Sequence, residues 1–441
     1  MRALLLITIC FSFAISLEAQ KTFNRKSQAK LVQFVDESPV FQRGFTGFFL
    51  FDPENRTTLH NYQGDKYFTP ASNTKILTLF AAETILESQL PVLNYRTQGD
   101  TLQFWGTGYP LLLHPYFTDF DTLNNWLLEL PANHWLVSNQ HFQDQHFGEG
   151  WSWDDYPYGY QLEKAALPIY GNRVQISKAG HLSPILLTPA YFQQRLIYQD
   201  GPTLSRLEDR NIFTFGQRAL LVNSLDRRIA FRYSLPLFTE LLRDTFQRTV
   251  DYNLAPLPPD TLRQELQAPM PDTLLKVFMQ DSDNYLAEQL LLMCSSKRYG
   301  LLNTQQTIEY VNDTLLAYLP QPLDWVDGSG LSRYNQFTPQ SITMVLDQLY
   351  QRIPQERLFR IFPAGGQSGT ISSWYAGPND EVFIFAKTGT LRHIHCLSGY
   401  LRSKSGKVYI FSFMHNNFPD KIKTLKSEME KVLLWLYEEL E

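Results

Sequence analysis

The 441-residue chain lacks the features that define several protein classes. It has only three cysteines, too few for a disulfide-stapled fold of this length. No block of Lys or Arg indicates nucleic-acid binding, no acidic tail indicates a basic partner, and the net charge is only −5. His393, His395 and His415 lack the HExxH-type spacing of a metal site, and no internal repeat is present. We therefore expect no metal, cofactor or nucleic acid, and the residues indicate no protein partner.

Long apolar runs are equally scarce, with one exception at the N-terminus. Met1-Arg2 gives a positive start, residues 3–17 are uncharged and largely apolar, and a small residue, Ala19, follows. This pattern predicts a signal peptide over residues 1–19 and an exported, periplasmic protein. A membrane anchor is the alternative, but the run is shorter than the roughly 20 residues that span a bilayer. Peripheral contact with the membrane stays open.

What is present is ample material for packed cores. Hydrophobic residues make up 44% of the chain and aromatic residues 14%, which argues against disorder. The length favours two or three domains. After removal of the signal peptide, Cys294 and Cys396 remain; they either pair or are both buried thiols, and burial is the simpler expectation.

The order of elements predicts an α+β fold interrupted by an insertion. Near the N-terminus we expect a short helix, two strands over residues 44–52 and 57–68, and a central apolar helix over 71–86. Near the C-terminus we expect helices over 285–295 and from Thr338, strands over 381–388, 394–402 and 407–415, and a last helix over 421–440. Short strand-like segments, rich in Pro and Gly, lie between these two parts.

The economical arrangement is one domain with an antiparallel sheet flanked by helices, formed by residues 20–90 and 270–441. A large, mainly-β insertion, residues 91–269, splits it. The Pro-rich segments at residues 255–259 and 268–271 mark the seam.

Ser72 and Lys75 form the first chemical motif, Ser72-Asn73-Thr74-Lys75, at the start of the central helix. A hydroxyl at a helix start lies near the positive end of the helix dipole, and a lysine three residues later lies one turn along the same face. A partly desolvated lysine can act as a base toward that hydroxyl. A second Ser-x-x-Lys, Ser27 to Lys30, has no partner motif, and we interpret it as a chance match.

Two further motifs follow in order. Ser282-Asp283-Asn284 is the one Ser-x-Asn in the chain, and by itself it also suits an ordinary helix cap. Lys387-Thr388-Gly389-Thr390 closes the apolar run Val382 to Ala386, where Gly389 would let a ligand backbone approach the sheet edge. Lys-Thr-Gly is expected in fewer than about one chain in ten of this length.

Ser-x-x-Lys, Ser-x-Asn and Lys-Thr-Gly in this order resemble the motifs of the penicillin-recognising serine enzymes. Further segments resemble the low-molecular-mass class C penicillin-binding proteins, the D-Ala-D-Ala carboxypeptidase/endopeptidase group. These segments are Asp327 to Arg333 (DGSGLSR) with Thr338-Pro339, Ala364 to Thr370 (AGGQSGT), Ser398 to Tyr400 and Gly150 to Tyr156 (GWSWDDY). The chain departs from the family pattern at Ser368 and Tyr109, where the family commonly has Asp.

The resemblance covers nearly the whole mature chain. It implies a β-lactamase/transpeptidase-like domain whose insertion holds a second domain with a third nested inside it. More than 200 residues separate Lys75 from Ser282, far more than in β-lactamases.

The resemblance also implies roles for the motif residues. Ser72 would be the nucleophile, Lys75 its base, Ser282 a proton relay and Asn284 a partner of Lys75 or the substrate amide. Lys387, with the hydroxyls of Thr388 and Thr390, would bind the terminal carboxylate, and Gly389 would admit the substrate backbone. The backbone N–H groups of Ser72 and Thr390 would hold the oxyanion. Trp151, Asp154 and Tyr160 would contact the amine end of the stem-peptide side chain, although a core or capping role fits them equally well.

The expected substrate is therefore the peptidoglycan stem peptide, with β-lactams as covalent inhibitors of Ser72. Two alternatives stay open. A serine β-lactamase would need fast deacylation, and no deacylating glutamate can be assigned. A catalytically silent wall-binding protein would not need all three motifs intact. An esterase of the same fold usually has a tyrosine motif in place of Ser-Asp-Asn.

Overall fold

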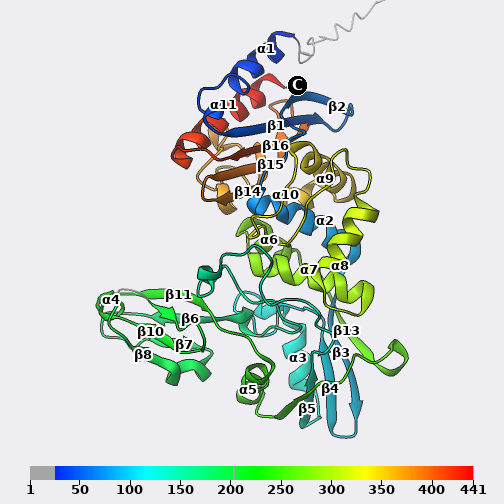
Figure 1. Cartoon of the computed structure of the whole chain (residues 1–441), viewed down its shortest axis with the longest axis vertical. Coiled ribbons are helices and arrows are strands. Elements are labelled where there is room, and N and C mark those ends of the chain that lie inside the picture. The colour runs from blue at the N-terminus through cyan, green and yellow to red at the C-terminus, as the bar shows by residue number, and fades with distance from the viewer. Residues whose placement is uncertain (1–24, 202–203, 441) are drawn as a thin grey trace, which may run out of the picture.

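A computed structural model describes residues 25–201 and 204–440. The predicted signal peptide lies outside the described residues. Figure 1 shows three parts: the two chain ends meet in one part, at the top, whereas the middle of the chain forms a lower part and a smaller lobe beside it. In the described ranges no helix is long and apolar enough to cross a membrane.

The part that unites both chain ends is built on a five-stranded antiparallel sheet in the order β14-β15-β16-β1-β2. The strands are β1 (Phe45–Asp52), β2 (Thr57–Tyr62), β14 (Ile384–Leu391), β15 (Ile394–Arg402) and β16 (Val408–Asn416). β1 pairs directly with β16, with Phe48 opposite Phe413, so strands more than 350 residues apart are neighbours. The inner strands are apolar along most of their length because helices cover both faces of the sheet.

One face of this sheet carries α1 (Arg25–Phe34) and α11 (Ile422–Glu439), which pack with it around a buried cluster that includes Phe48 and Leu433. The other face carries the central helix α2 (Lys75–Ile85) and α9 (Pro339–Arg352), together with α7 (Asn284–Tyr299) behind α2. Thr338 caps α9 and Pro339 is its first residue, as the sequence predicts. Three shorter helices complete this layer: α6 (Asp272–Gln280), α8 (Thr304–Tyr310) and α10 (Gln355–Ile361).

The lower part is built on a second five-stranded sheet in the order β12-β5-β4-β3-β13, partly parallel and partly antiparallel. Its elements are β3 (Gln89–Gln98), β4 (Thr101–Gly106), α3 (Thr122–Glu129), β5 (His134–Ser138), α5 (Leu235–Phe246), β12 (Thr249–Asn253) and β13 (Gln264–Pro269). β3 follows α2 almost directly, and β13 leads back into α6. The start of β3 and the end of β13 are paired neighbours, so both connections to the first part lie at the same end of these two strands (Figure 1).

The smaller lobe consists of two three-stranded sheets, β11-β6-β7 and β8-β10-β9. Its elements are β6 (Arg173–Lys178), β7 (Leu186–Thr188), β8 (Leu196–Tyr198), β9 (Ser205–Arg206), β10 (Phe213–Phe215), α4 (Gln217–Leu221) and β11 (Leu225–Ala230). Its chain leaves the lower part after β5 and returns at α5.

Two local expectations are wrong. The strand expected over residues 381–388 starts later, at Ile384, and continues through the whole Lys-Thr-Gly-Thr motif to Leu391, because β15 pairs with it along its full length. Ser72 lies in a 3₁₀ turn, Ala71–Thr74, and not in the first turn of the α-helix itself. Cys294 and Cys396 are free and buried, as expected.

Candidate active site

Ser72 lies in the 3₁₀ turn that precedes α2, and this turn packs against strands β14 and β15. Its neighbour Ala71 has the left-handed backbone conformation, with φ of 48°, which bends the chain sharply before the helix. Ser72 is partly exposed, whereas Ala71, Asn73 and Thr74 around it are buried. The turn therefore presents one partly exposed hydroxyl from an otherwise buried segment.

Lys75 is fully buried and directs its amine back at that hydroxyl. Lys75 Nζ donates to Ser72 Oγ at 3.1 Å, to Asn284 Oδ1 at 2.6 Å and to the Ser329 carbonyl at 2.7 Å. Burial lowers the pKa of Lys75 to about 8, although the charges of Asp327, Asp283 and Glu288 oppose the shift. A lysine with that pKa is neutral in roughly a tenth of the molecules at pH 7, so the amine can accept a proton from the serine.

Ser282 and Lys387 form a second pair at the same cleft. Lys387 Nζ donates to Ser282 Oγ at 2.9 Å and to the Thr388 carbonyl at 3.0 Å. Lys387 is fully buried, and burial, followed by the nearby charge of Lys75, holds its pKa well below the ordinary value. Asn284 accepts a hydrogen bond from Lys75, and Ser282, two residues earlier, accepts one from Lys387. The Ser-Asp-Asn turn therefore connects the two lysines.

Strand β14 lies directly against the turn that holds Ser72. A Cβ atom on Gly389 would come within 2.2 Å of the Pro70 carbonyl oxygen and 3.1 Å of the Ser72 nitrogen, so glycine permits this approach. The threonine hydroxyls on either side bond elsewhere: Thr388 Oγ1 to Thr370 Oγ1 at 2.7 Å, and Thr390 Oγ1 to His395 Nδ1 at 2.9 Å. The Thr390 hydroxyl was expected to bind the terminal carboxylate of the substrate. Because it already bonds to His395, it is less available for that contact.

Two buried acids that sequence reasoning missed hold the segment behind Lys75. Glu288 accepts hydrogen bonds from the backbone N–H groups of Gly328 and Ser329, at 3.2 and 2.8 Å. Asp327 accepts from the N–H groups of Gly330 and Ser332, at 2.8 and 2.7 Å. These bonds fix the Ser329 carbonyl that receives Lys75. One pattern could have revealed Glu288: it lies four residues after Asn284, on the same face of one helix.

One loop of the inserted region, which carries Trp151 and Tyr160, contacts this site. Trp151 Nε1 donates to Asp327 Oδ2 at 2.8 Å, and the Tyr160 carbonyl accepts from Asn284 Nδ2 at 2.9 Å. The Tyr160 ring is exposed and stacks on Tyr158 with 5.3 Å between ring centroids. Asp154 is exposed, and within the described ranges no hydrogen bond joins its side chain to the motif residues. Trp151 and Tyr160 therefore touch the catalytic network, whereas Asp154 does not.

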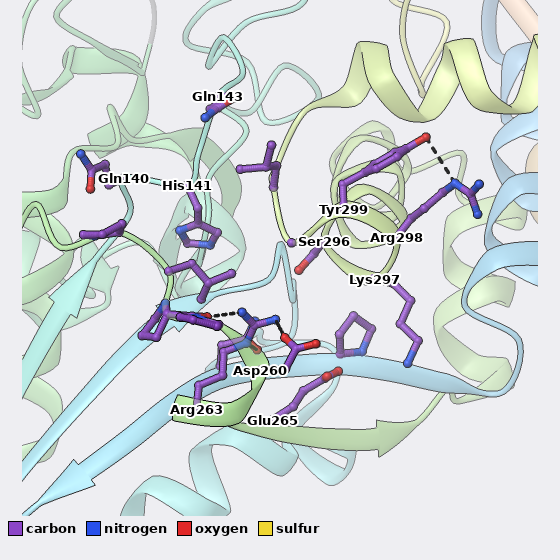
Figure 2. Close-up of a pocket in the computed structure, with 18 of the residues that line it drawn as sticks. Gln140, His141, Gln143, Asp260, Arg263, Glu265, Ser296, Lys297, Arg298 and Tyr299 are labelled. Atoms are coloured by element: carbon purple, nitrogen blue, oxygen red, sulfur yellow. Dashed lines mark hydrogen bonds and ion pairs between the residues drawn. The ribbon is translucent and has the colours of Figure 1, made fainter.

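A large polar hollow, about 1090 Å³, lies far from these residues. It borders the C-terminal end of α7 from Ser296 onward, whereas Asn284 begins that helix, so about 18 Å of helix separates the two places. Figure 2 shows Arg263 next to Asp260, and the Arg263 guanidinium also bonds to Asn94 and the Pro258 carbonyl. The Arg263 guanidinium thus has its partners within the protein, and the hollow lies where the lower part meets the end of α7.

Comparisons with known proteins agree with this geometry. The model of the D-Ala-D-Ala carboxypeptidase 3 (S13) family matches residues 27–436. The D-alanyl-D-alanine carboxypeptidase DacB of Haemophilus influenzae is 23% identical, over 89% of this chain and 90% of that protein. A D-alanyl-D-alanine carboxypeptidase of an Actinomadura species is 24% identical, over 94% of this chain and 87% of the other. The crystal structure of penicillin-binding protein 4 from H. influenzae matches with a TM-score of 0.71 at 21% identity, covering 93% of this chain and 99% of that one.

Proposed function

Because the chain belongs to the D-Ala-D-Ala carboxypeptidase 3 (S13) family, we propose that Ser72 is the nucleophile of a serine D-Ala-D-Ala carboxypeptidase and DD-endopeptidase. It cleaves D-alanyl peptide bonds in peptidoglycan stem peptides, and penicillins acylate the same serine. The observation that carries the proposal is the Lys75 amine, which is buried and lies 3.1 Å from Ser72 Oγ. The predicted signal peptide supports a periplasmic location.

In the first step, neutral Lys75 takes the proton of Ser72 as Oγ attacks the carbonyl of the penultimate D-alanine. The backbone N–H groups of Ser72 and Thr390 stabilise the oxyanion; in comparable enzymes one such donor contributes about 3–4 kcal/mol. Ser282 passes a proton to the departing amine as the C–N bond breaks. Water then hydrolyses the Ser72 ester and regenerates the hydroxyl.

The Lys387 amine binds the terminal carboxylate of the substrate, and the Thr388 hydroxyl supports it from the same strand. Gly389 lets β14 lie close to the Ser72 turn, so that a substrate backbone bound along the edge of β14 is held beside Ser72. On the other side of the site, the loop that carries Trp151, Asp154 and Tyr160 contacts the amine-bearing side chain of the stem peptide. The exposed carboxylate of Asp154 suits a cation that arrives from solvent.

Two alternative functions fit the site less well than the peptidase does. A β-lactamase needs a group that activates water for rapid deacylation. The three acids near Lys75 have other partners: Glu288 and Asp327 accept from backbone N–H groups, and Asp283 accepts from the Leu286 N–H and pairs with Arg173. A silent wall-binding protein would not need the buried Ser72–Lys75–Asn284 network. Release of bound penicillin over minutes or longer would support the peptidase, whereas turnover within seconds would favour the lactamase.

The decisive experiment is Ser72→Ala. We expect it to abolish covalent labelling by fluorescent penicillin and hydrolysis of a D-Ala-D-Ala pentapeptide, while the melting temperature changes by a few degrees at most. Ser27→Ala, at the chance Ser-x-x-Lys match, is the control and should label normally. Labelling that persists in Ser72→Ala would show that the nucleophile is another residue. Mass analysis of products from monomeric and cross-linked wall peptides would then separate carboxypeptidase from endopeptidase activity.

A further inference from the structure

A separate hollow of about 640 Å³ lies behind the loop that carries Trp151, between this loop and the small lobe. Aromatic side chains form one wall: Phe147, Trp151, Trp153 and Tyr156. Phe147 and Trp151 meet edge to face with centroids 6.2 Å apart. Trp153 stands at the rim with 75% of its surface exposed, a large apolar surface without a packing role.

Planar polar groups form the rest of the hollow. Gln161 is only 2% exposed; its Nε2 donates to the Ser152 carbonyl at 2.7 Å, but its Oε1 has no hydrogen-bond partner in the part of the chain that is described. Glu163 is 5% exposed, and burial raises its pKa to about 7, against the charges of Arg206 and Arg232. A buried acceptor without a donor is costly unless a ligand or water supplies one.

The charges of this hollow argue for an uncharged ligand. The Arg206 guanidinium is committed to the carbonyls of Ala230, Leu207 and Glu208, at 2.9, 2.7 and 3.2 Å. Arg232 donates to the Asp209 carbonyl at 3.2 Å. The lining holds these two arginines and three acids, Glu163, Glu208 and Asp209, so an anion would meet no excess of positive charge here. The unsatisfied group is a neutral acceptor, Gln161 Oε1.

We propose that this hollow binds a saccharide ring of the glycan strand from which the stem peptide projects. A pyranose ring has an apolar C–H face that can stack on an indole, and its hydroxyl and acetamido N–H groups are neutral donors that suit Gln161 Oε1. This inference rests on the proposed function, since it takes the sugar from the same polymer. It places the glycan on the far side of the Trp151 loop from the peptide.

The position of the hollow suits such a ligand. Trp151 lines the hollow with its ring and donates from Nε1 to Asp327, two residues before the Ser329 carbonyl that receives Lys75. A stem peptide of four or five residues extends at most about 3.5 Å per residue, or about 14–18 Å. The inference therefore requires the hollow and Ser72 Oγ to lie within this reach of each other, on the two sides of the loop.

The test uses Trp153→Ala in the full chain, with Tyr198→Ala, an exposed aromatic on β8 outside the hollow, as the matched control. Each variant is assayed on the free pentapeptide and on the same peptide attached to its disaccharide. We expect Trp153→Ala to lower kcat/KM for the disaccharide-peptide about tenfold and to leave the free pentapeptide and penicillin acylation unchanged. Tyr198→Ala should change neither.

A direct binding measurement separates this inference from the proposed function. Titration with an N-acetylglucosamine tetramer should change the tryptophan fluorescence of the wild-type chain and of Ser72→Ala, but the change should be lost in Trp153→Ala. This result would stand even if the chain hydrolysed no peptide. No binding of the tetramer to the wild-type chain, or equal loss of activity on both peptide substrates in Trp153→Ala, would overturn the proposal.

Discussion

At the scale of single residues, the chemistry depends on the protonation of two buried lysines. Burial lowers the pKa of Lys75 to about 8, and it holds the pKa of Lys387 well below its ordinary value. Their partners differ: Lys75 lies near three acids, whereas Lys387 contacts a hydroxyl and a carbonyl. Each lysine therefore predicts its own pH dependence.

If Lys75 is the base, only its neutral form accepts the proton of Ser72. The rate of acylation by penicillin should therefore rise with pH, reach half its maximum near pH 8 and level off above it. Stopped-flow measurement of acylation from pH 6 to 9.5 checks this. Lys75→Ala should lower the rate by at least a hundredfold and remove this rise. A rate independent of pH across this range would contradict the assignment.

Lys387 should take up a proton when a carboxylate binds. In the free site burial disfavours the charged amine, whereas a substrate carboxylate supplies the missing counter-charge and raises the pKa. Calorimetric binding of a non-cleavable carboxylate ligand to Ser72→Ala at pH 8 should give an enthalpy that depends on the ionisation enthalpy of the buffer. Lys387→Ala should bind more weakly and lose this dependence. Equal enthalpies in all buffers would show that Lys387 is already charged.

At the scale of elements, the site is made where α7 faces the segment from Asp327 to Gly330. Glu288 holds that segment from one helix turn below Asn284. Burial, with the charge of Asp327, raises the pKa of Glu288, whereas its hydrogen bonds from Ser329 and Gly328 favour the ionised form, which stabilises protonated Lys75.

Glu288→Gln tests this role of α7. An amide can accept one backbone N–H but presents its own N–H to the second, so the Ser329 carbonyl should shift and acylation should slow at least tenfold. Loss of the acid should also move the midpoint of the pH profile below that of the wild type, a change that a purely structural role would not cause. Glu309→Gln, exposed on α8, is the control. An unchanged midpoint would contradict the role of Glu288 toward Lys75.

The elements also show how far the sequence could predict the site. The short motifs name Ser72, Lys75, Asn284 and Lys387, and the structure brings these side chains into one hydrogen-bonded region. The end of β14 was misjudged because the apolar run stops at Ala386, whereas the strand continues by pairing with β15. Glu288 was missed because its partners, Gly328 and Ser329, lie about 40 residues away and only folding reveals its burial.

At the scale of the whole molecule, the insertion is bonded to the catalytic residues and not merely attached beside them. Gln289 Nε2 donates to the carbonyls of Gly108 and Ala165, at 2.7 and 3.0 Å. Arg173, the first residue of β6, pairs with Asp283 at 3.2 Å, in the middle of the Ser-Asp-Asn turn. The small lobe thus contacts the very turn that joins the two lysine pairs.

Arg173→Leu should therefore weaken both folding and catalysis. The side chains of Arg173 and Asp283 are only 6% and 13% exposed, and removal of one partner from a buried pair costs about 3–5 kcal/mol. We expect the free energy of unfolding in urea at pH 7 to fall by about this amount, and acylation to slow as the Ser282 turn shifts. Arg173→Leu with Asp283→Asn should recover much of the stability, because Asn also caps a helix and carries no charge.

The stability that Arg173→Leu loses should depend on pH, because the Asp283 carboxyl titrates. Burial alone would raise the pKa of Asp283, but Arg173 and the N–H of Leu286 outweigh it and hold the pKa below its ordinary value. A lowered carboxyl pKa stabilises the fold above the unfolded value of about 4, and this contribution is lost as the pH falls through the folded value. The gap between wild type and Arg173→Leu should thus be full at pH 7 and narrow as the pH falls below about 4. A gap that widens on acidification would mean that the pair does not stabilise the turn through its charge.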